Sequence, residues 1–128
     1  MVAENDRGCG IFASVNRVLP ELPRIANNVD QVRAFVADND NPERREAVEA
    51  EIARRGPPPD LVIEASPGKR HYYWLTTDCL LEDFKPMQQA IAAALGTDPS
   101  ICDLPRVMRL PGFLHRKAVP FLVRVVYP

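Results

Sequence analysis

The sequence has few cysteines, no long apolar run and almost no net charge. Cys9, Cys79 and Cys102 are widely spaced, form no Cys-x-x-Cys pair and have no histidine at zinc-ligand spacing, so we expect reduced thiols and a cytoplasmic protein. No apolar stretch approaches the ~20 residues that cross a bilayer. The N-terminus also lacks the basic-then-apolar order of a signal peptide, so we expect neither a membrane span nor secretion.

A formal net charge of −1 gives no overall basic field of the kind that marks tight nucleic-acid binders. The charges are nevertheless unevenly distributed. The segment 104–128 contains no acidic residue and five basic ones: Arg106, Arg109, Arg116, Lys117 and Arg124. Such a cluster suits an anionic ligand or a solvated rim, and the cluster taken alone favours the rim.

Proline is abundant, with 13 in 128 residues, about twice its usual share of ~5%. Because proline ends helices and is confined to strand edges, this number predicts short elements with many turns and disfavours a long helical bundle. A chain of this length fits one domain, and we expect a single domain over residues 1–128.

Periodicity and turn residues predict a mixture of strands and helices. Asn41-Pro42 is a good helix start, and Gly96 is a good helix stop. Residues 31–38 are expected to begin as a helix and to end as a strand. The expected strands cover 10–15, 61–65, 71–75, 106–110 and 121–126, and the expected helices cover 42–55 and 81–95. Since strands and helices do not alternate regularly, we expect an α+β fold with a mixed or antiparallel sheet and flanking helices.

Asp38 and Asp40 are two residues apart, so on an extended segment both carboxylates leave the same face. Two such acids suit Mg²⁺ or Mn²⁺, which prefer oxygen ligands and often share them with substrate phosphates. The same Asp-Asn-Asp, followed by Asn41-Pro42, is also a good turn and helix-capping sequence, and the pair alone favours that structural interpretation.

The turn from Ser66 to Lys69 precedes His71 at the start of an expected strand. Exposed backbone N–H groups, a hydroxyl, a lysine and an imidazole can together surround phosphate oxygens. A tight turn beside a half-buried histidine is the alternative. Further along, Asp98 precedes Arg106 and Arg109, whose guanidinium groups suit bidentate phosphate binding but are equally common on ordinary surfaces.

Taken in order, three segments resemble the motifs of archaeo-eukaryotic-type primases, most closely the RepB-like primase domains of plasmids and phages. They are Asp-Asn-Asp at 38–40, Ser-Pro-Gly-Lys-Arg-His at 66–71, and Asp98 followed by Arg-Val-Met-Arg-Leu-Pro-Gly at 106–112. The resemblance covers about residues 7–126. It implies a primase-polymerase catalytic core with an RRM-like sheet.

The resemblance also implies roles for single residues. Asp38, Asp40 and Asp98 would hold two Mg²⁺ or Mn²⁺ ions, with Asp103 as a rival for the third acid. His71 would act with these acids. The nucleotide would be bound by Ser66, Lys69, His71, Arg106, Arg109 and Lys117. The implied activity is that of a DNA primase or primase-polymerase, which makes primers from NTPs or dNTPs on single-stranded DNA in plasmid or phage replication. A helicase or another replication module is the implied partner.

Two residues depart from the family pattern: Asn39 replaces an apolar residue, and His115 stands where asparagine is common. These departures leave a second hypothesis open, in which the chain is a catalytically inactive primase-fold module that binds single-stranded nucleic acid or replication partners. A third hypothesis is an unrelated metal-dependent phosphohydrolase. It does not explain why the segments 66–71 and 106–112 occur together.

Overall fold

The computed structural model describes residues 1–127, and residue 128, the last of the expected domain, lies outside the described part. The helical segments are α1 (Val2–Asp6), α2 (Arg45–Arg55) and α3 (Leu81–Leu95), with short 3-10 turns η1 (Ala26–Asn28) and η2 (Pro42–Arg44). The strands are β1 (Phe12–Ser14), β2 (Arg17–Val18), β3 (Val29–Gln31), β4 (Ala34–Asn39), β5 (Leu61–Ser66), β6 (Lys69–Leu75), β7 (Val107–Arg109), β8 (Leu114–His115), β9 (Phe121–Leu122) and β10 (Arg124–Tyr127).

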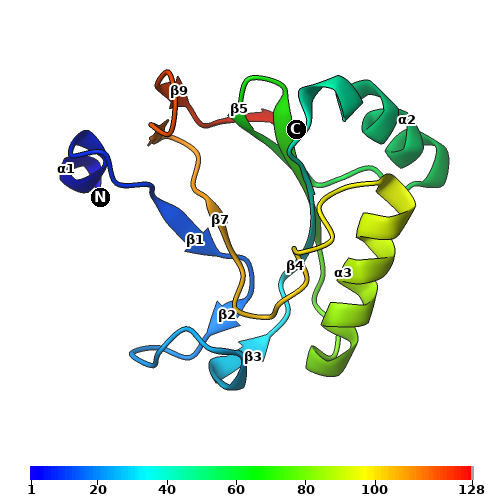
Figure 1. The fold of residues 1–128 in the computed structure, drawn as a ribbon. Coiled ribbons are helices and arrows are strands. Elements are labelled where there is room, and N and C mark those ends of the chain that lie inside the picture. Colours follow the sequence, from blue (N-terminus) through cyan, green and yellow to red (C-terminus); the bar gives the residue numbers. More distant parts are fainter. Residues whose placement is uncertain (128) are drawn as a thin grey trace.

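A four-stranded antiparallel sheet in the order β10-β5-β6-β4 forms the centre of the fold. Helices α2 and α3 lie on one side of this curved sheet, while β1, β2, β3 and β7 lie on the other (Figure 1). We call the sheet with α2 and α3 the sheet layer, and residues 10–31 with 104–122 the arm. The expected α+β fold with an antiparallel sheet and flanking helices is confirmed.

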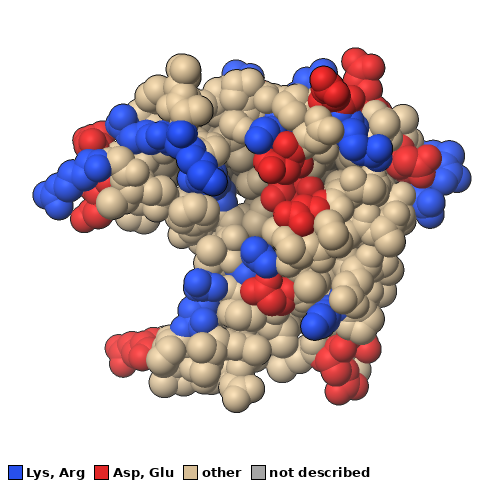
Figure 2. Space-filling model, in the orientation of Figure 1, with Lys and Arg blue, Asp and Glu red and all other residues tan. Residues whose placement is uncertain are grey.

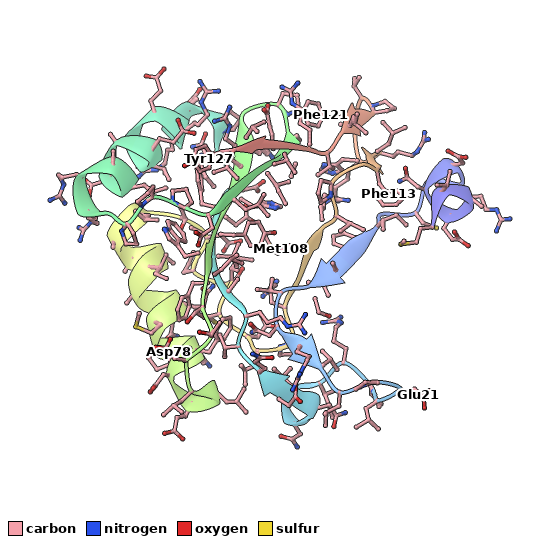
Figure 3. The ribbon with its side chains drawn as sticks, turned by 180° about the vertical axis from the view of Figure 1, so that it is seen from behind. Glu21, Asp78, Met108, Phe113, Phe121 and Tyr127 are labelled. Atoms are coloured by element: carbon pink, nitrogen blue, oxygen red, sulfur yellow. The ribbon has the colours of Figure 1, made fainter. Side chains whose placement is uncertain are left out.

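The alternation of side chains in the sheet creates two cores. Val62 and Tyr72 face the helices, whereas their neighbours Ile63 and Tyr73 face the arm, because successive strand residues point to opposite faces. The core under the helices contains Ala37, Val48, Ile52, Val62, Tyr72 and Leu95. The core between sheet and arm contains Ala34, Val36, Ile63, Tyr73, Ile101, Met108 and Val123, with Met108 placed between β7 and the sheet (Figure 3).

The arm contains only short strand pairs. β1 pairs with β7, β2 with β3, and β8 with β9, each over two or three residues. The expected strand over 121–126 is interrupted at Val123, whose N–H donates to Phe113 O and whose carbonyl accepts from Gly112 N. These two bonds tie Val123 to the preceding turn, so β9 and β10 belong to different sheets.

One other expectation needs correction, and one helix was not expected. The helical beginning expected over 31–38 is wrong: Gln31 ends β3, and Ala34–Asn39 pairs with β6 along its whole length. The side chain of Asn16 accepts a hydrogen bond from Arg33 N, which fixes the extended backbone between the two strands. The short α1 was not expected. No helix within residues 1–127 is long and apolar enough to cross a membrane.

Helix 42–55 begins as the 3-10 turn η2, where the Asn41 side chain accepts from Glu43 N as expected for an N-cap. Helix 81–95 has the expected bounds and ends at Gly96, which has φ +68°. A left-handed backbone of this kind suits glycine, and it directs the chain toward the segment that carries Asp98.

Candidate active site

The outer edge of β4 is closed by a glutamine from α3. Gln88 is 1% exposed, donates to the carbonyls of Val36 and Ile101, and accepts from Val36 N at 2.8 Å. The N–H and C=O of Val36 therefore point away from β6. Residues two apart on a strand share this orientation, so Val36 and Asp38 oppose Tyr73 and His71 in non-hydrogen-bonded pairs, where cross-strand side chains are closest.

Asp38 and His71 consequently lie side by side on the face of the sheet that looks toward the arm. Nε2 of His71 lies 3.5 Å from Oδ1 of Asp38. His71 is 7% exposed, and burial, with a further contribution from the nearby Arg109, lowers its pKa to about 4. The imidazole is thus neutral at pH 7. Its Nδ1 is buried and has no hydrogen-bond partner among the described residues.

The same edge of β4 brings Asp98 to the two acids of the first motif. Asp98 N donates to Asp38 O at 3.0 Å, directly beyond the position that Gln88 occupies. Burial raises the pKa of Asp38 to about 6, and the negative charges of Asp40 and Asp98 contribute to this rise. The three carboxylates therefore interact electrostatically, although the carboxylate of Asp98 is turned toward Ser100, from whose N–H and hydroxyl it accepts.

Positively charged and polar groups surround Asp38 and Asp40 in a cavity of about 270 Å³. Lys69 Nζ lies 3.1 Å from Asp40 Oδ1, and Nδ1 of His115 donates to Ala65 O at 2.9 Å. Of the residues predicted from sequence, the cavity is lined by Asp38, Asp40, Ser66, Lys69, His71, Arg106, Arg109 and Lys117. Asp98 instead lines an adjacent hollow of about 320 Å³, which it shares with Asp38 and Asp40.

Asp103, the rival third acid, is directed elsewhere. It accepts from Arg106 Nε at 2.7 Å, while Arg106 Nη2 donates to Ser100 O. Asp103 lines neither of the two hollows. The backbone bond between Asp98 and Asp38 therefore makes Asp98 the better candidate for a third acid.

The surface around the site is hollowed and divided by charge. Figure 2 shows a hollow with Lys and Arg side chains on its upper and lower margins and a group of acidic side chains to its right. Sequence reasoning missed three contributors: Phe12 in the cavity, Gln88 at the edge of β4, and Asn5, whose side chain bonds to the backbone of Leu114. None of them belongs to a local motif, because each acts across a long separation in sequence.

The cavity differs from a preformed metal centre. No group of three or more His, Cys, Asp or Glu side chains within residues 1–127 has the spacing of metal ligands. Asp38 and Asp40 are close enough to one another for Asp40 to raise the pKa of Asp38. The donor set therefore fits a cation that takes two carboxylates and completes its shell with water and phosphate oxygens, as Mg²⁺ commonly does.

Solved structures with a similar fold are primases. The AEP domain of the primase-polymerase of cyanophage S-2L matches with a TM-score of 0.79 and 20% identity, over 97% of this chain and 65% of that chain. Primase RepB′ matches with a TM-score of 0.71 and 20% identity, over 97% of this chain and 39% of that chain. The catalytic domain of primase RepB′, in a complex with initiator DNA, matches with a TM-score of 0.67 and 19% identity, over 98% of this chain and 59% of that chain.

These matches show a shared fold, and this chain spans less than two thirds of each relative. Among curated proteins no match is found. The family model of the RepB DNA-primase N-terminal domain matches residues 15–126, which include all three motifs and nearly every strand of the fold. The chain belongs to the family of RepB DNA-primase N-terminal domains.

Proposed function

We propose that this chain is the catalytic domain of a DNA primase. It would join NTPs or dNTPs into primers on single-stranded DNA, in plasmid or phage replication, with Mg²⁺ or Mn²⁺. The observation that carries the proposal is the single cavity in which Asp38 and Asp40 face Lys69, Arg109 and Lys117. Nucleotidyl transfer needs this combination, because carboxylates can hold a metal while cations hold the triphosphate.

Asp38, Asp40 and Asp98 would bind the metal ions. Burial is the main cause of the raised pKa of Asp38, and the negative charges of Asp40 and Asp98 add to it, so a cation bound at these acids would relieve part of the cost. The chemistry that divalent ions would supply at these acids is a lower pKa for an attacking hydroxyl and stabilisation of the leaving pyrophosphate. Asp98 would join the site by turning its carboxylate away from Ser100.

The other residues would bind and orient the nucleotide. Lys69 and Arg109 would neutralise phosphate oxygens, and their places on β6 and β7 put both of them beside the acids before a nucleotide binds. Ser66, Arg106 and Lys117 line the same cavity and would add hydrogen bonds and charge. Because His71 is neutral at pH 7, it would contribute a hydrogen bond rather than a charge.

Primer synthesis on single-stranded DNA, with NTPs or dNTPs and either Mg²⁺ or Mn²⁺, tests the proposal. We expect Asp38→Asn and Asp40→Asn each to reduce synthesis by about a hundredfold or more, since removal of one preorganised electrostatic group commonly costs this much. The control is Asp83→Asn, an exposed carboxylate in the first turn of α3, which should leave synthesis unchanged. Unimpaired synthesis by the Asp38→Asn, Asp40→Asn double variant would refute the roles of these acids.

The second candidate is the primase-fold module without catalysis, which the orientation of the Asp98 carboxylate toward Ser100 favours. It predicts that the wild-type chain binds single-stranded DNA but makes no primer. Calorimetry with an NTP and Mn²⁺ separates the two candidates, because only the enzyme needs metal-dependent nucleotide binding. The helicase or other replication module stays a predicted partner.

A further inference from the structure

An aromatic side chain from the arm lies at the candidate active site. Phe12 is 47% exposed, yet it lines the same cavity as Asp38, His71 and Arg109. Phe12 and Arg109 are directly paired across β1 and β7, and the guanidinium carbon of Arg109 lies 4.8 Å from the centre of the ring. A half-exposed ring with a cation over it is therefore placed beside the groups proposed to hold a triphosphate.

The position of this ring depends on a glycine. A Cβ at Gly10 would lie 2.7 Å from Phe12 Cε2 and 3.0 Å from Arg109 Nη1, so any side chain there would force one of these groups to move. The φ of Gly10 does not lie in the left-handed region, and the backbone itself therefore allows other residues. Gly10 thus serves to admit the Phe12–Arg109 pair, which places the ring in the cavity before any ligand binds.

We propose that Phe12, backed by Arg109, is the surface on which a nucleobase stacks in the candidate active site. This inference rests on the proposed function and adds to it the residue that holds the base. The free part of the ring is flat and apolar, whereas the other predicted nucleotide-binding residues are charged or polar and suit phosphate. Stacking on an aromatic side chain accepts any base, because every base has a π-face, and a nearby arginine strengthens such contacts.

The nucleobase can come from the incoming nucleotide or from the DNA strand, and binding measurements separate these sources. Three ligands are compared by calorimetry in the presence of Mn²⁺: ATP, inorganic triphosphate, which lacks a base, and oligo(dT) without nucleotide. The variants are Phe12→Ala, Phe12→Trp and Gly10→Ala. The control is Tyr127→Ala, which removes an aromatic side chain of nearly equal exposure, 46%, from β10, outside the cavity.

We expect Phe12→Ala to weaken the binding of ATP, oligo(dT) or both by about tenfold, while inorganic triphosphate binds as in the wild type. Phe12→Trp should retain the wild-type affinity, and Gly10→Ala should weaken binding because it displaces the ring. A loss confined to ATP assigns the base to the incoming nucleotide, and a loss confined to oligo(dT) assigns it to the strand.

The proposal is overturned if Phe12→Ala binds both ATP and oligo(dT) like the wild type, or if it loses triphosphate binding as strongly as ATP binding. Either result leaves the proposed function standing, because the wild-type chain still binds nucleotide. A wild-type chain that binds neither ATP nor triphosphate with Mn²⁺ overturns both proposals together. Thermal unfolding of each variant shows that a lost affinity does not reflect a lost fold.

Discussion

The sheet layer contributes the acids of the candidate site together with Lys69, whereas the charged groups that the arm contributes to the cavity are all basic. Asp38 and Asp40 come at the end of β4, in a sheet whose strands are four to seven residues long. Arg109 and Lys117 come from the arm, whose pairs extend over two or three residues. The pairing of β4 with β6 over its whole length fixes the positions of the two acids, while the positions of the cations in the arm depend on a few hydrogen bonds. We therefore expect the arm to open more easily than the sheet layer.

The largest effect is expected at Gln88, because it closes the edge of the sheet layer. Gln88→Leu keeps the size of the side chain but leaves the N–H and C=O of Val36 and the C=O of Ile101 buried without partners. Each such group costs ~1–3 kcal/mol, so the free energy of unfolding should fall by at least ~3 kcal/mol. Urea denaturation measures this loss. The matched control is Gln89→Leu on the exposed side of α3, where little change is expected.

An equal effect of the two glutamine substitutions would contradict the assigned role of Gln88. If the role is correct, Gln88→Leu should also impair primer synthesis in the protein that remains folded. The bond from Asp98 N to Asp38 O follows directly on the bonds of Gln88 along β4, so loss of the latter loosens the segment that carries Asp98. This outcome would show that the edge of the sheet layer holds all three acids.

The next largest effect concerns the folding stability that the protein loses by burying Asp38 beside two other acids. The pKa of Asp38 is raised from 3.8 to about 6, so the folded protein holds this proton more tightly than the unfolded chain. Stability from this group is therefore lost as the pH rises from about 4 to 6. Asp38→Asn avoids the loss and should be more stable than the wild type at pH 7 by roughly 3 kcal/mol, with no difference near pH 4.

Urea denaturation of both proteins at pH 4 and pH 7, in the presence of EDTA, measures this difference. His71 acts in the opposite sense: its pKa is lowered from 6.5 to about 4, so its contribution is lost as the pH falls through this range. Both proteins contain His71, and its effect is therefore largely removed when they are compared. An Asp38→Asn variant that is less stable than the wild type at pH 7 would show that the clustered acids stabilise the fold.

The sheet layer was more predictable from sequence than the arm for the same physical reason. The hairpin 61–75 and the helix 81–95 have strong local signals, and their bounds agree closely with β5, β6 and α3. Arm strands of two or three residues have almost no periodicity, and long-range bonds such as those of Asn16 and Val123 decide where they begin and end. Local patterns cannot report such bonds.

The candidate site follows the same division. The motifs identified the charged site residues, and the structure brings all of them except Asp98 and its rival Asp103 into one cavity. The sequence did not predict Phe12 as a site residue, because its place in the cavity depends on its pairing with Arg109, almost a hundred residues away in sequence. The tilt of Asp98 toward Ser100 was equally unpredictable, since it depends on hydrogen bonds within a single turn.

The smallest and most local effect is expected at Asn5, which fastens the arm to α1. Its side chain is 5% exposed, donates to Leu114 O at 2.8 Å and to Cys9 O at 3.0 Å, and accepts from Leu114 N at 2.9 Å. The side-chain amide of Asn5 thus bonds to the backbone of β8 as a neighbouring strand would. β8 is followed along the chain by Lys117. Asn5→Ala should lower the overall free energy of unfolding by only ~1–2 kcal/mol, because no core residue is removed.

Hydrogen exchange provides the sharper measurement of this variant. The Leu114 amide loses its partner in Asn5→Ala and should exchange at least tenfold faster, whereas the Tyr73 amide in the sheet layer should exchange almost as in the wild type. Glu4→Ala, at an exposed position of the same helix, is the control. Equal acceleration at Leu114 and Tyr73 would mean that arm and sheet layer unfold as one unit. Acceleration at Leu114 alone, together with weaker nucleotide binding, would show that Arg109 and Lys117 depend on a part of the molecule that opens by itself.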